Sequence, residues 1–466
     1  MTRRRRAAQL ACLLAAGWIA GCVHYQPKPV TLDATLDHFE QRSLSDPGLA
    51  RAAAPARIAA TWPPASWDLR ALTVAALYYN PDLASVRDAW AVARAGIVTA
   101  GARPNPSPAS TGPGYNSTSD PSTIRPWILN LNLDFTIETA GKRGHRVAAA
   151  RNLSESARFQ VAAAAWQVRA RVRQALLDLF SASQSVDILT SQQALANGNN
   201  ALFQRQLTAG EISTFEMAQA RLQLDAIRLA LADARRQQED ARARLAAAIG
   251  VPIGALDGIH LDLDAFDAVP GNIPDRAARR AALLNRADLL GALASYEASQ
   301  SALQLEIAQQ YPDLHLGPGY QLDQDQNKWT IFAFPAVLPV FNRNQGPIGE
   351  AEARRTAAAD AVVAAQAGAI GAIERAMGAY RTGLDALDVA DQSLVEVRTA
   401  ERTAAAQFAA GAISKLDLGV IQVELASRQL ARLQSLVQVQ QALGDLEDAM
   451  QRPADLPIDP LPRNPQ

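Results

Sequence analysis

Cysteine, histidine and net charge are all scarce in this sequence. The 466-residue chain has two Cys and five His, and its 45 Lys+Arg nearly balance its 46 Asp+Glu, for a formal charge of −1. A zinc ribbon, an iron–sulfur site and a disulfide framework need clustered or paired residues of these types, so they are excluded. The near-zero charge gives no general attraction for nucleic acid, and no nucleic-acid partner is expected. With 20% charged and 48% hydrophobic residues, the chain is neither a disordered polyanion nor a multi-span membrane protein.

Signatures of catalysis are also missing. The His residues show no HExxH or other metal-ligand spacing, and the sequence has no Gly-x-Ser-x-Gly elbow and no phosphate loop. Lys142 and Arg143 follow Gly141, but their surroundings lack the Walker pattern, so a solvated turn is expected there. We therefore expect no enzyme activity, no catalytic residue, and no metal or cofactor site.

The N-terminus has the features of an export signal. Arg3 to Arg6 form a basic region and Ala7 to Ala20 a short apolar region, too short to span a bilayer comfortably. The Ile-Ala-Gly-Cys sequence that ends at Cys22 resembles the bacterial lipobox. Residues 1–21 are therefore predicted to be a lipoprotein signal peptide and Cys22 the lipidated residue; the alternative is an ordinary signal with an incidental Cys. By resemblance to known sorting rules, Val23 in place of Asp favours the outer membrane.

The sequence repeats itself at long range. Four pairs of matching segments are 205 residues apart, and a fifth pair is 201 residues apart. The second repeat is therefore four residues shorter before its last matching segment. The shortening falls in a helical stretch, where about one turn can be deleted while the apolar face stays nearly in register. The ordered series indicates a tandem duplication of a unit of about 200 residues. The pairs are Asn80 and Asn285, Gly112–Tyr115 and Gly317–Tyr320, Gly141 and Gly346, Gly144 and Gly349, and Ala209–Ser213 and Ala410–Ser414.

Each repeat has the same plan. The first repeat (67–250) and the second (276–451) each begin with a helical stretch, predicted over 67–103 and 276–310. Strands and a long helical hairpin follow in each. The remaining predicted boundaries are strands about 105–138 and 312–340, hairpins about 142–249 and 346–450, a lipidated linker 22–66, an inter-repeat linker 251–275 and a Pro-rich tail 452–466.

Both strand regions alternate apolar and polar residues. From Trp127 to Ile137, and from Leu314 to Leu322, every second residue falls on one apolar face. Strands of about 9–11 residues suit a tilted membrane crossing, although a soluble sandwich hairpin has the same alternation. Four strands cannot close a barrel, and open edges are not tolerated in lipid. A membrane barrel would therefore need several chains; two copies give eight strands, three give twelve, and the pattern does not choose.

The helical stretches are long and resemble coiled coils. Between Arg146 and Leu207 there is no Pro and a single Gly. About 60 helical residues extend roughly 90 Å. Apolar residues step by four and three along them, as in a heptad seam. The seam residues are Val168, Val172, Ala175, Leu179, Ala182, Val186 and Leu189, then Ala220, Leu224, Ile227, Leu231 and Ala234, and in the second repeat Val423, Ala426, Leu430, Leu433 and Val437.

In their order and duplication, these features resemble the TolC-like outer-membrane efflux family. The lipobox, Asn80–Leu83, Gly141–Arg143, Leu338–Asn342 and the duplicated Gly-x-Ile-Ser turns carry the resemblance, which covers about residues 67–450. It implies a mainly α fold with a small membrane β-barrel portion, in which three copies form a trimeric α-barrel/β-barrel channel. Such a homotrimer would lie in the outer membrane, extend into the periplasm, and work with a periplasmic adaptor (membrane fusion) protein and an inner-membrane efflux pump. Residues 137–143 look most like the heavy-metal and nodulation-type branch.

The two hairpin tips are predicted to contact the adaptor. Gly can leave a helix with positive φ, and a Ser three residues later suits the N-cap of the returning helix. The alternative is an ordinary helix break with no partner. The predicted tip residues are Gly210, Glu211, Ile212, Ser213, Gly411, Ala412, Ile413 and Ser414.

A periplasmic gate is predicted at Glu216 and Asp417. Each lies six residues after a tip glycine, which places it about one to two turns into the returning helix. By resemblance, Asp417 matches a position of the family's acidic constriction, Glu216 is its repeat counterpart, and Val420 stands at the second acidic position. The alternative is that both carboxylates cap a helix N-terminus or face solvent.

The predicted function is the outer-membrane channel component of a tripartite efflux pump, conducting substrates passively. A lipid-anchored periplasmic coiled-coil adaptor or scaffold is the alternative. Two hairpins, each with its own strands, favour the channel. The sequence identifies neither the exported substrate nor the cognate pump.

Overall fold

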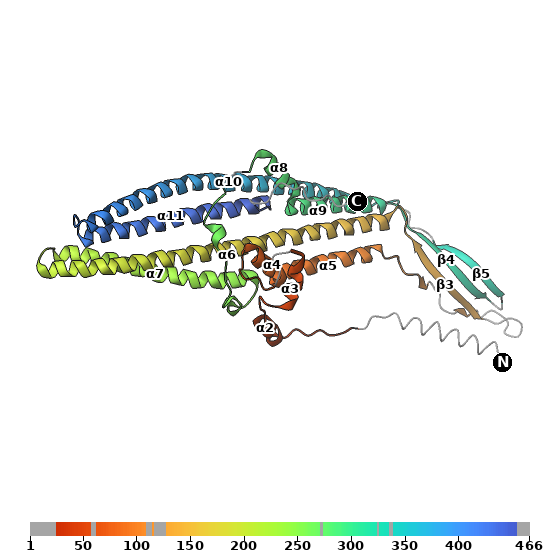
Figure 1. The fold of residues 1–466 in the computed structure, drawn as a ribbon. Coiled ribbons are helices and arrows are strands. Elements are labelled where there is room, and N and C mark those ends of the chain that lie inside the picture. The colour runs from red at the N-terminus through yellow and green to blue at the C-terminus, as the bar shows by residue number, and fades with distance from the viewer. Residues whose placement is uncertain are drawn as a thin grey trace. The chain divides into compact units, whose positions relative to one another are not determined.

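The computed structural model describes residues 25–56, 62–108, 114–115, 127–270, 274–323, 326–334 and 339–453 (Figure 1). The predicted signal peptide, Cys22 and most of the Pro-rich tail lie outside these residues. The chain divides into two units, residues 1–43 and 44–466. In the first unit, α2 (Leu32–Glu40) is an exposed helix whose N-cap is Thr31.

Two helices separated by a sharp break open each repeat, where a single helical stretch was predicted. At the first break, the Asn80 side chain accepts hydrogen bonds from the backbone N–H groups of Asp82 and Leu83, at 3.0 and 3.3 Å. Pro81 then starts the next helix, because its missing N–H is not needed at a first turn. The second break lies at Arg286, in the same place of the second repeat. After α3 (Pro47–Ala53) and the short 3₁₀ turn η1 (Ala54–Ala56), these helices are α4 (Leu69–Tyr79) and α5 (Pro81–Gly101), then α8 (Arg276–Asn285) and α9 (Ala287–Ala308).

The strands form one antiparallel sheet in the order β1-β3-β4-β5, with β2 also paired to β3. The central pair joins the two repeats, with Leu131 opposite Tyr320 and Phe135 opposite Leu316. Pro318 of β4 has no paired residue on β3, because proline has no N–H to donate to the neighbouring strand. In the predicted strand region 105–138, the part before β3 is described only as two short pieces. The strands are β1 (Ser107–Pro108), β2 (Gly114–Tyr115), β3 (Trp127–Ile137), β4 (Leu314–Asp323) and β5 (Gln326–Phe334).

Four long helices run side by side in the order α7, α6, α11, α10 (Figure 1). Each repeat supplies one hairpin, and α6 packs on α11 to join the two hairpins. The predicted seams lie in these contacts, and most of their residues are buried, as heptad packing requires. The hairpins are α6 (Lys142–Ala209) with α7 (Thr214–Ile249), and α10 (Gln345–Ala409) with α11 (Lys415–Met450).

Among the described helices, α10 is long and apolar enough to cross a membrane by length and composition alone. Little of its most apolar window is buried within the chain. This window is rich in Ala and belongs to a 65-residue coiled-coil helix. We therefore attribute the hydropathy of this window to its Ala content.

The linker between the repeats folds onto the helices and completes the main core. Its two 3₁₀ turns, η2 (Ile253–Leu256) and η3 (Asp264–Phe266), bury Leu256 and Phe266. The buried Gln440 side chain donates hydrogen bonds to the carbonyl oxygens of Phe266 and Ala268, at 3.1 and 2.7 Å. The linker is thus fixed to α11 by a polar side chain inside the core.

Candidate functional site

The two hairpin tips have the same backbone geometry. Gly210 and Gly411 adopt φ values of 75° and 73°, a left-handed conformation that favours glycine. In each tip the next residue donates its backbone N–H into the preceding helix, from Glu211 to Gln206 and from Ala412 to Gln407, both at 2.8 Å. The predicted tip residues therefore do form two matching turns, with Ile212 and Ile413 half-buried and the other six exposed.

Both returning helices begin with a capping box. Ser213 Oγ accepts a hydrogen bond from the N–H of Glu216 at 3.2 Å, and the Glu216 carboxylate accepts one from the Ser213 N–H at 2.7 Å. Ser414 and Asp417 form the same pair of bonds, at 3.2 and 3.0 Å. The serines are the N-caps that the sequence predicted.

The capping box places the two carboxylates in the first helical turn, which is closer to the tip than predicted. Backbone and side-chain hydrogen bonds from Ser213 lower the pKa of Glu216, and those from Ser414, side chain and backbone, lower the pKa of Asp417. Both groups are exposed and ionised at neutral pH. Within one chain they act as helix caps.

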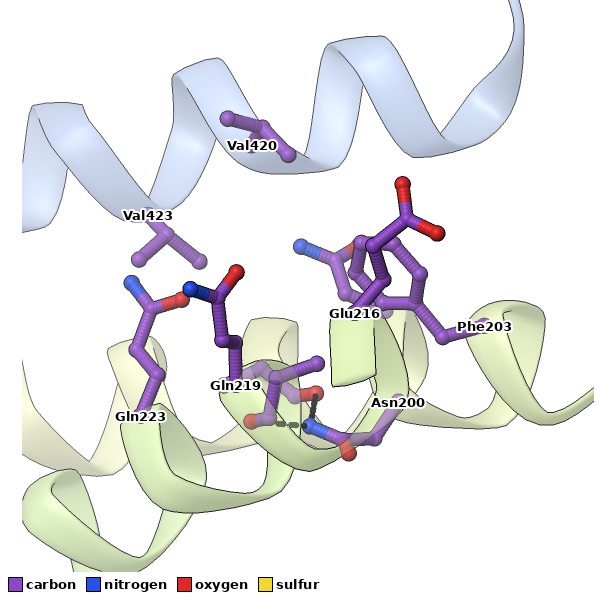
Figure 2. Close-up of a pocket in the computed structure, with 10 residues that line it drawn as sticks. Asn200, Phe203, Glu216, Gln219, Gln223, Val420 and Val423 are labelled. Atoms are coloured by element: carbon purple, nitrogen blue, oxygen red, sulfur yellow. Dashed lines mark hydrogen bonds between the residues drawn. The ribbon is translucent and has the colours of Figure 1, made fainter. Parts of the chain in front are cut away.

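Glu216 also lines a pocket between the two hairpins, close to the tips (Figure 2). Its carboxylate points from α7 towards α11, which carries Val420, and Val423 lies nearer Gln219 and Gln223. Asn200 closes the base by donating to the carbonyls of Ala196 and Ala220, at 3.2 and 3.1 Å. The pocket has a volume of about 320 Å³ and contains one charged side chain. Its lining residues are Ala196, Asn199, Asn200, Phe203, Glu216, Gln219, Ala220, Gln223, Val420 and Val423.

The two predicted gate residues, Glu216 and Asp417, differ in their relation to this pocket. Glu216 lies on the pocket that joins the hairpins, whereas Asp417 does not line it. Val420 takes the place opposite Glu216. Within one chain, this pocket therefore has a single carboxylate beside valines and amides.

The apolar face of the sheet is exposed. In β3, exposure alternates along the strand, and the six apolar side chains from Trp127 to Ile137 are the exposed ones, at 39–56%. Their polar neighbours are the more covered residues. Tyr320 and Trp329 pack ring to ring at a centroid distance of 5.0 Å on the neighbouring strands. This arrangement is the reverse of that in a water-soluble sheet, and it is suited to contact with lipid.

The turn that joins the sheet to α6 corrects one prediction. Lys142, expected in a solvated turn, is 8% exposed. Its Nζ donates to the Tyr311 carbonyl at 2.7 Å and to Asp313 Oδ1 at 2.6 Å. This ion pair ties the end of β3 to the start of β4, and so joins the two repeats. The sequence reveals the position of Lys142 but not its partner 171 residues away.

A buried polar cluster at the α6–α11 contact was not predicted. Arg173 donates to the Gln440 carbonyl at 2.8 Å and to its side-chain oxygen at 3.0 Å. Glu447 lies 3.6 Å from the same guanidinium and accepts from Arg169 at 2.9 Å. Burial lowers the pKa of Arg173, although Glu447 opposes this effect. No group of three His, Cys, Asp or Glu residues suited to a metal ion exists among the described residues.

A model of the outer membrane efflux protein family matches residues 72–251 and 278–450, which is most of the chain. The chain belongs to the outer membrane efflux protein family. The two matched ranges correspond to the two repeats. Membership confirms the family that the sequence resembles and the prediction of a protein that is not an enzyme.

Individual relatives of this efflux protein agree with that assignment. The cobalt-zinc-cadmium resistance protein CzcC of Cupriavidus metallidurans is 29% identical over 224 residues, which cover 46% of this chain. The match spans 50% of CzcC, so the chain spans about half the length of that relative.

Solved structures share the fold. A membrane protein from Pseudomonas aeruginosa matches with a TM-score of 0.68 and 20% identity, over 83% of this chain and 90% of that one. The outer membrane protein VceC from Vibrio cholerae matches with a TM-score of 0.65 and 20% identity, over 83% and 96% of the two chains. These likenesses confirm the predicted mainly α fold with a small sheet.

Proposed function

We propose that this efflux protein is the outer-membrane channel of a tripartite efflux system. The exposed apolar face of β3 carries the proposal. The strand has 11 residues, so it is about 36 Å long, and a tilt near 40° leaves about 28 Å across the membrane. That height matches the hydrocarbon core of a bilayer.

The channel is a homotrimer in this proposal. The edges of the helical layer support closure with further copies, because α7 and α10 both present apolar side chains to solvent. Phe215, Leu222 and Leu229 repeat every seven residues along α7 and are 68–73% exposed. Val389 and Val395 are similarly exposed on α10. A row with heptad spacing suits a second helix, and three chains supply the twelve strands of the predicted barrel.

The hairpin tips and Cys22 are assigned to the other components of the efflux system and to the membrane. The glycine tips lie far along the hairpins from the sheet (Figure 1), so we assign them to the periplasmic end and to docking of an adaptor protein. An inner-membrane pump supplies the energy, and the channel conducts passively. Cleavage before Cys22 and its acylation anchor the chain in the outer membrane. Because CzcC is named for resistance to cobalt, zinc and cadmium, divalent cations are the first substrates to test.

Planar bilayers test the channel and its gate together. The purified full chain should migrate as a heat-modifiable oligomer and form conducting pores. Confined carboxylates attract cations. Asp417→Asn and Glu216→Gln should therefore weaken block by divalent cations and change cation selectivity. A chain that inserts but conducts no ions would contradict the channel, whereas normal block in both variants would remove only the carboxylates from the gate.

A further inference from the structure

A pocket at the start of α10 combines two opposite charges with unusually exposed apolar side chains. Phe341 is 95% exposed and Val340 is 62% exposed. Arg343 and Glu352 line the same pocket, which has a volume of about 550 Å³, together with the amide side chains of Gln310 and Gln345. An aromatic side chain left almost wholly in water is unfavourable, so a cover for Phe341 is expected.

Among the described residues, the two charged side chains of this pocket have no protein partner. Arg343 donates its backbone N–H to Gln345 Oε1 at 2.7 Å, but its guanidinium forms no ion pair or hydrogen bond with the described residues. The carboxylate of Glu352 is likewise unpaired within the described ranges. Glu138, which lies 205 residues before Arg343 and so is its counterpart in the first repeat, pairs with Arg146.

The backbone around the pocket is held in place. Asn344 Nδ2 donates to the carbonyl oxygen and the carboxylate of Glu306 on α9, at 2.7 and 2.8 Å. Gln345, Ile348 and Glu352 follow the i, i+3, i+7 spacing of one helical face. The pocket therefore has a fixed wall made by the first two turns of α10.

The position of the pocket points to lipid. Its lining runs from Gln310, four residues before the start of β4, to the first turns of α10, so it lies where the sheet meets the long helices. If the sheet crosses the outer membrane, as proposed above, this level is the periplasmic surface of the bilayer. Aromatic side chains favour that interface, and Phe341 supplies an exposed one there.

We propose that this pocket binds a glycerophospholipid whose headgroup contains a phosphate and a primary ammonium, as in phosphatidylethanolamine. The phosphate meets the Arg343 guanidinium, and the ammonium donates hydrogen bonds to Glu352. The acyl chains cover Phe341 and Val340. A choline headgroup has no N–H to donate to Glu352, and a phosphoglycerol headgroup has no cation, so both bind more weakly.

Native mass spectrometry of the full-length oligomer tests this site. The delipidated protein is incubated with equal amounts of the ethanolamine, choline and glycerol phospholipids that have identical acyl chains. We expect the ethanolamine lipid to be retained about tenfold more than the glycerol lipid, the lower end of the effect of one charge-assisted hydrogen bond. Glu352→Gln should remove this preference, and Arg343→Gln should weaken retention of all three lipids about fivefold.

A matched pair of variants controls for general charge effects. Arg354 and Glu350 form an exposed ion pair at 2.8 Å on the same helix and do not line the pocket. Arg354→Gln and Glu350→Gln should leave the lipid preference unchanged. Equal retention of the three lipids by the unmodified protein, or an unchanged preference in Glu352→Gln, would overturn the site while leaving the channel proposal intact. Failure to form a membrane-inserted oligomer would overturn both.

Discussion

Gly444 on α11 offers the sharpest test of how the two hairpins are joined. A Cβ at this position would lie 2.3 Å from Arg173 Nη1 and 3.1 Å from Cζ, far closer than atoms pack. A flexible arginine could normally move aside. Here Arg173 is 6% exposed and is held by two hydrogen bonds to Gln440, and its guanidinium lies over the Phe266 ring.

Gly444→Ala should therefore destabilise the protein. Moving Arg173 breaks two hydrogen bonds from a charged donor, each worth about 1.5–3 kcal/mol. The higher helix propensity of Ala than of Gly offsets about 1 kcal/mol of this loss. With partial relaxation of the guanidinium, we expect a net loss of about 3 kcal/mol, and a melting temperature lower by roughly 3 °C.

Circular dichroism melts of the detergent-solubilised oligomer would measure this difference. Gly378→Ala on α10 is the control, since a Cβ there meets nothing within 4 Å, and it should be neutral or slightly stabilising. Arg173 and Gly444 are in contact, so Arg173→Met and Gly444→Ala should cost less together than the sum of the two separate losses. Equal melting temperatures for Gly444→Ala and Gly378→Ala would refute the argument.

Three further predictions concern other parts of the chain. Burial raises the pKa of Asp448 to about 6, so its charge destabilises the fold above that pH and the penalty fades as the pH falls towards 4. Asp448→Asn should therefore raise the melting temperature at pH 7.5, with a shrinking gain down to pH 4.5; the same gain at both pH values would contradict this. Mass spectrometry of the mature N-terminus should find diacylglyceryl Cys22, and Cys22→Ser should abolish anchoring; an unmodified N-terminus at another residue would exclude the lipobox. Cysteines placed at Glu211 or Ala412 should crosslink to an adaptor protein, and crosslinks only at the sheet end would reverse the orientation.

Features set by local periodicity could be predicted from the sequence. The alternation from Trp127 to Ile137 depends only on the two-residue repeat of a strand, and the structure places those side chains on one exposed face. The tip turns could also be predicted, because the sequence there has a glycine and then Ser-x-x-Glu or Ser-x-x-Asp, which supplies both residues of a capping box. Gly210, Ser213 and Glu216 are all within one turn of the same break.

Features that depend on distant partners could not be predicted. Lys142 looked like a turn residue, yet it is buried because Asp313 and the Tyr311 carbonyl are brought to it by the pairing of β3 with β4. Arg173 lies next to the apolar seam residue Val172, and no local signal shows that Gln440, 267 residues further on, accepts its hydrogen bonds. Buried polar groups are held by such long-range contacts, which a pattern of single residues does not encode.

The duplication has kept the backbone of the two halves and changed the side chains. The tips share positive-φ glycines and capping boxes, but Phe203 on the first hairpin corresponds to Ala404 on the second, and Gln219 corresponds to Val420. The pocket that contains Glu216 lies within one chain, between α7 and α11 (Figure 2). In the proposed trimer, contacts within chains would alternate with contacts between α7 and α10 of neighbouring chains. A partner that surrounds the tips would then meet two kinds of groove in alternation, so its contacts with the two hairpins cannot be equivalent even though the turns themselves match.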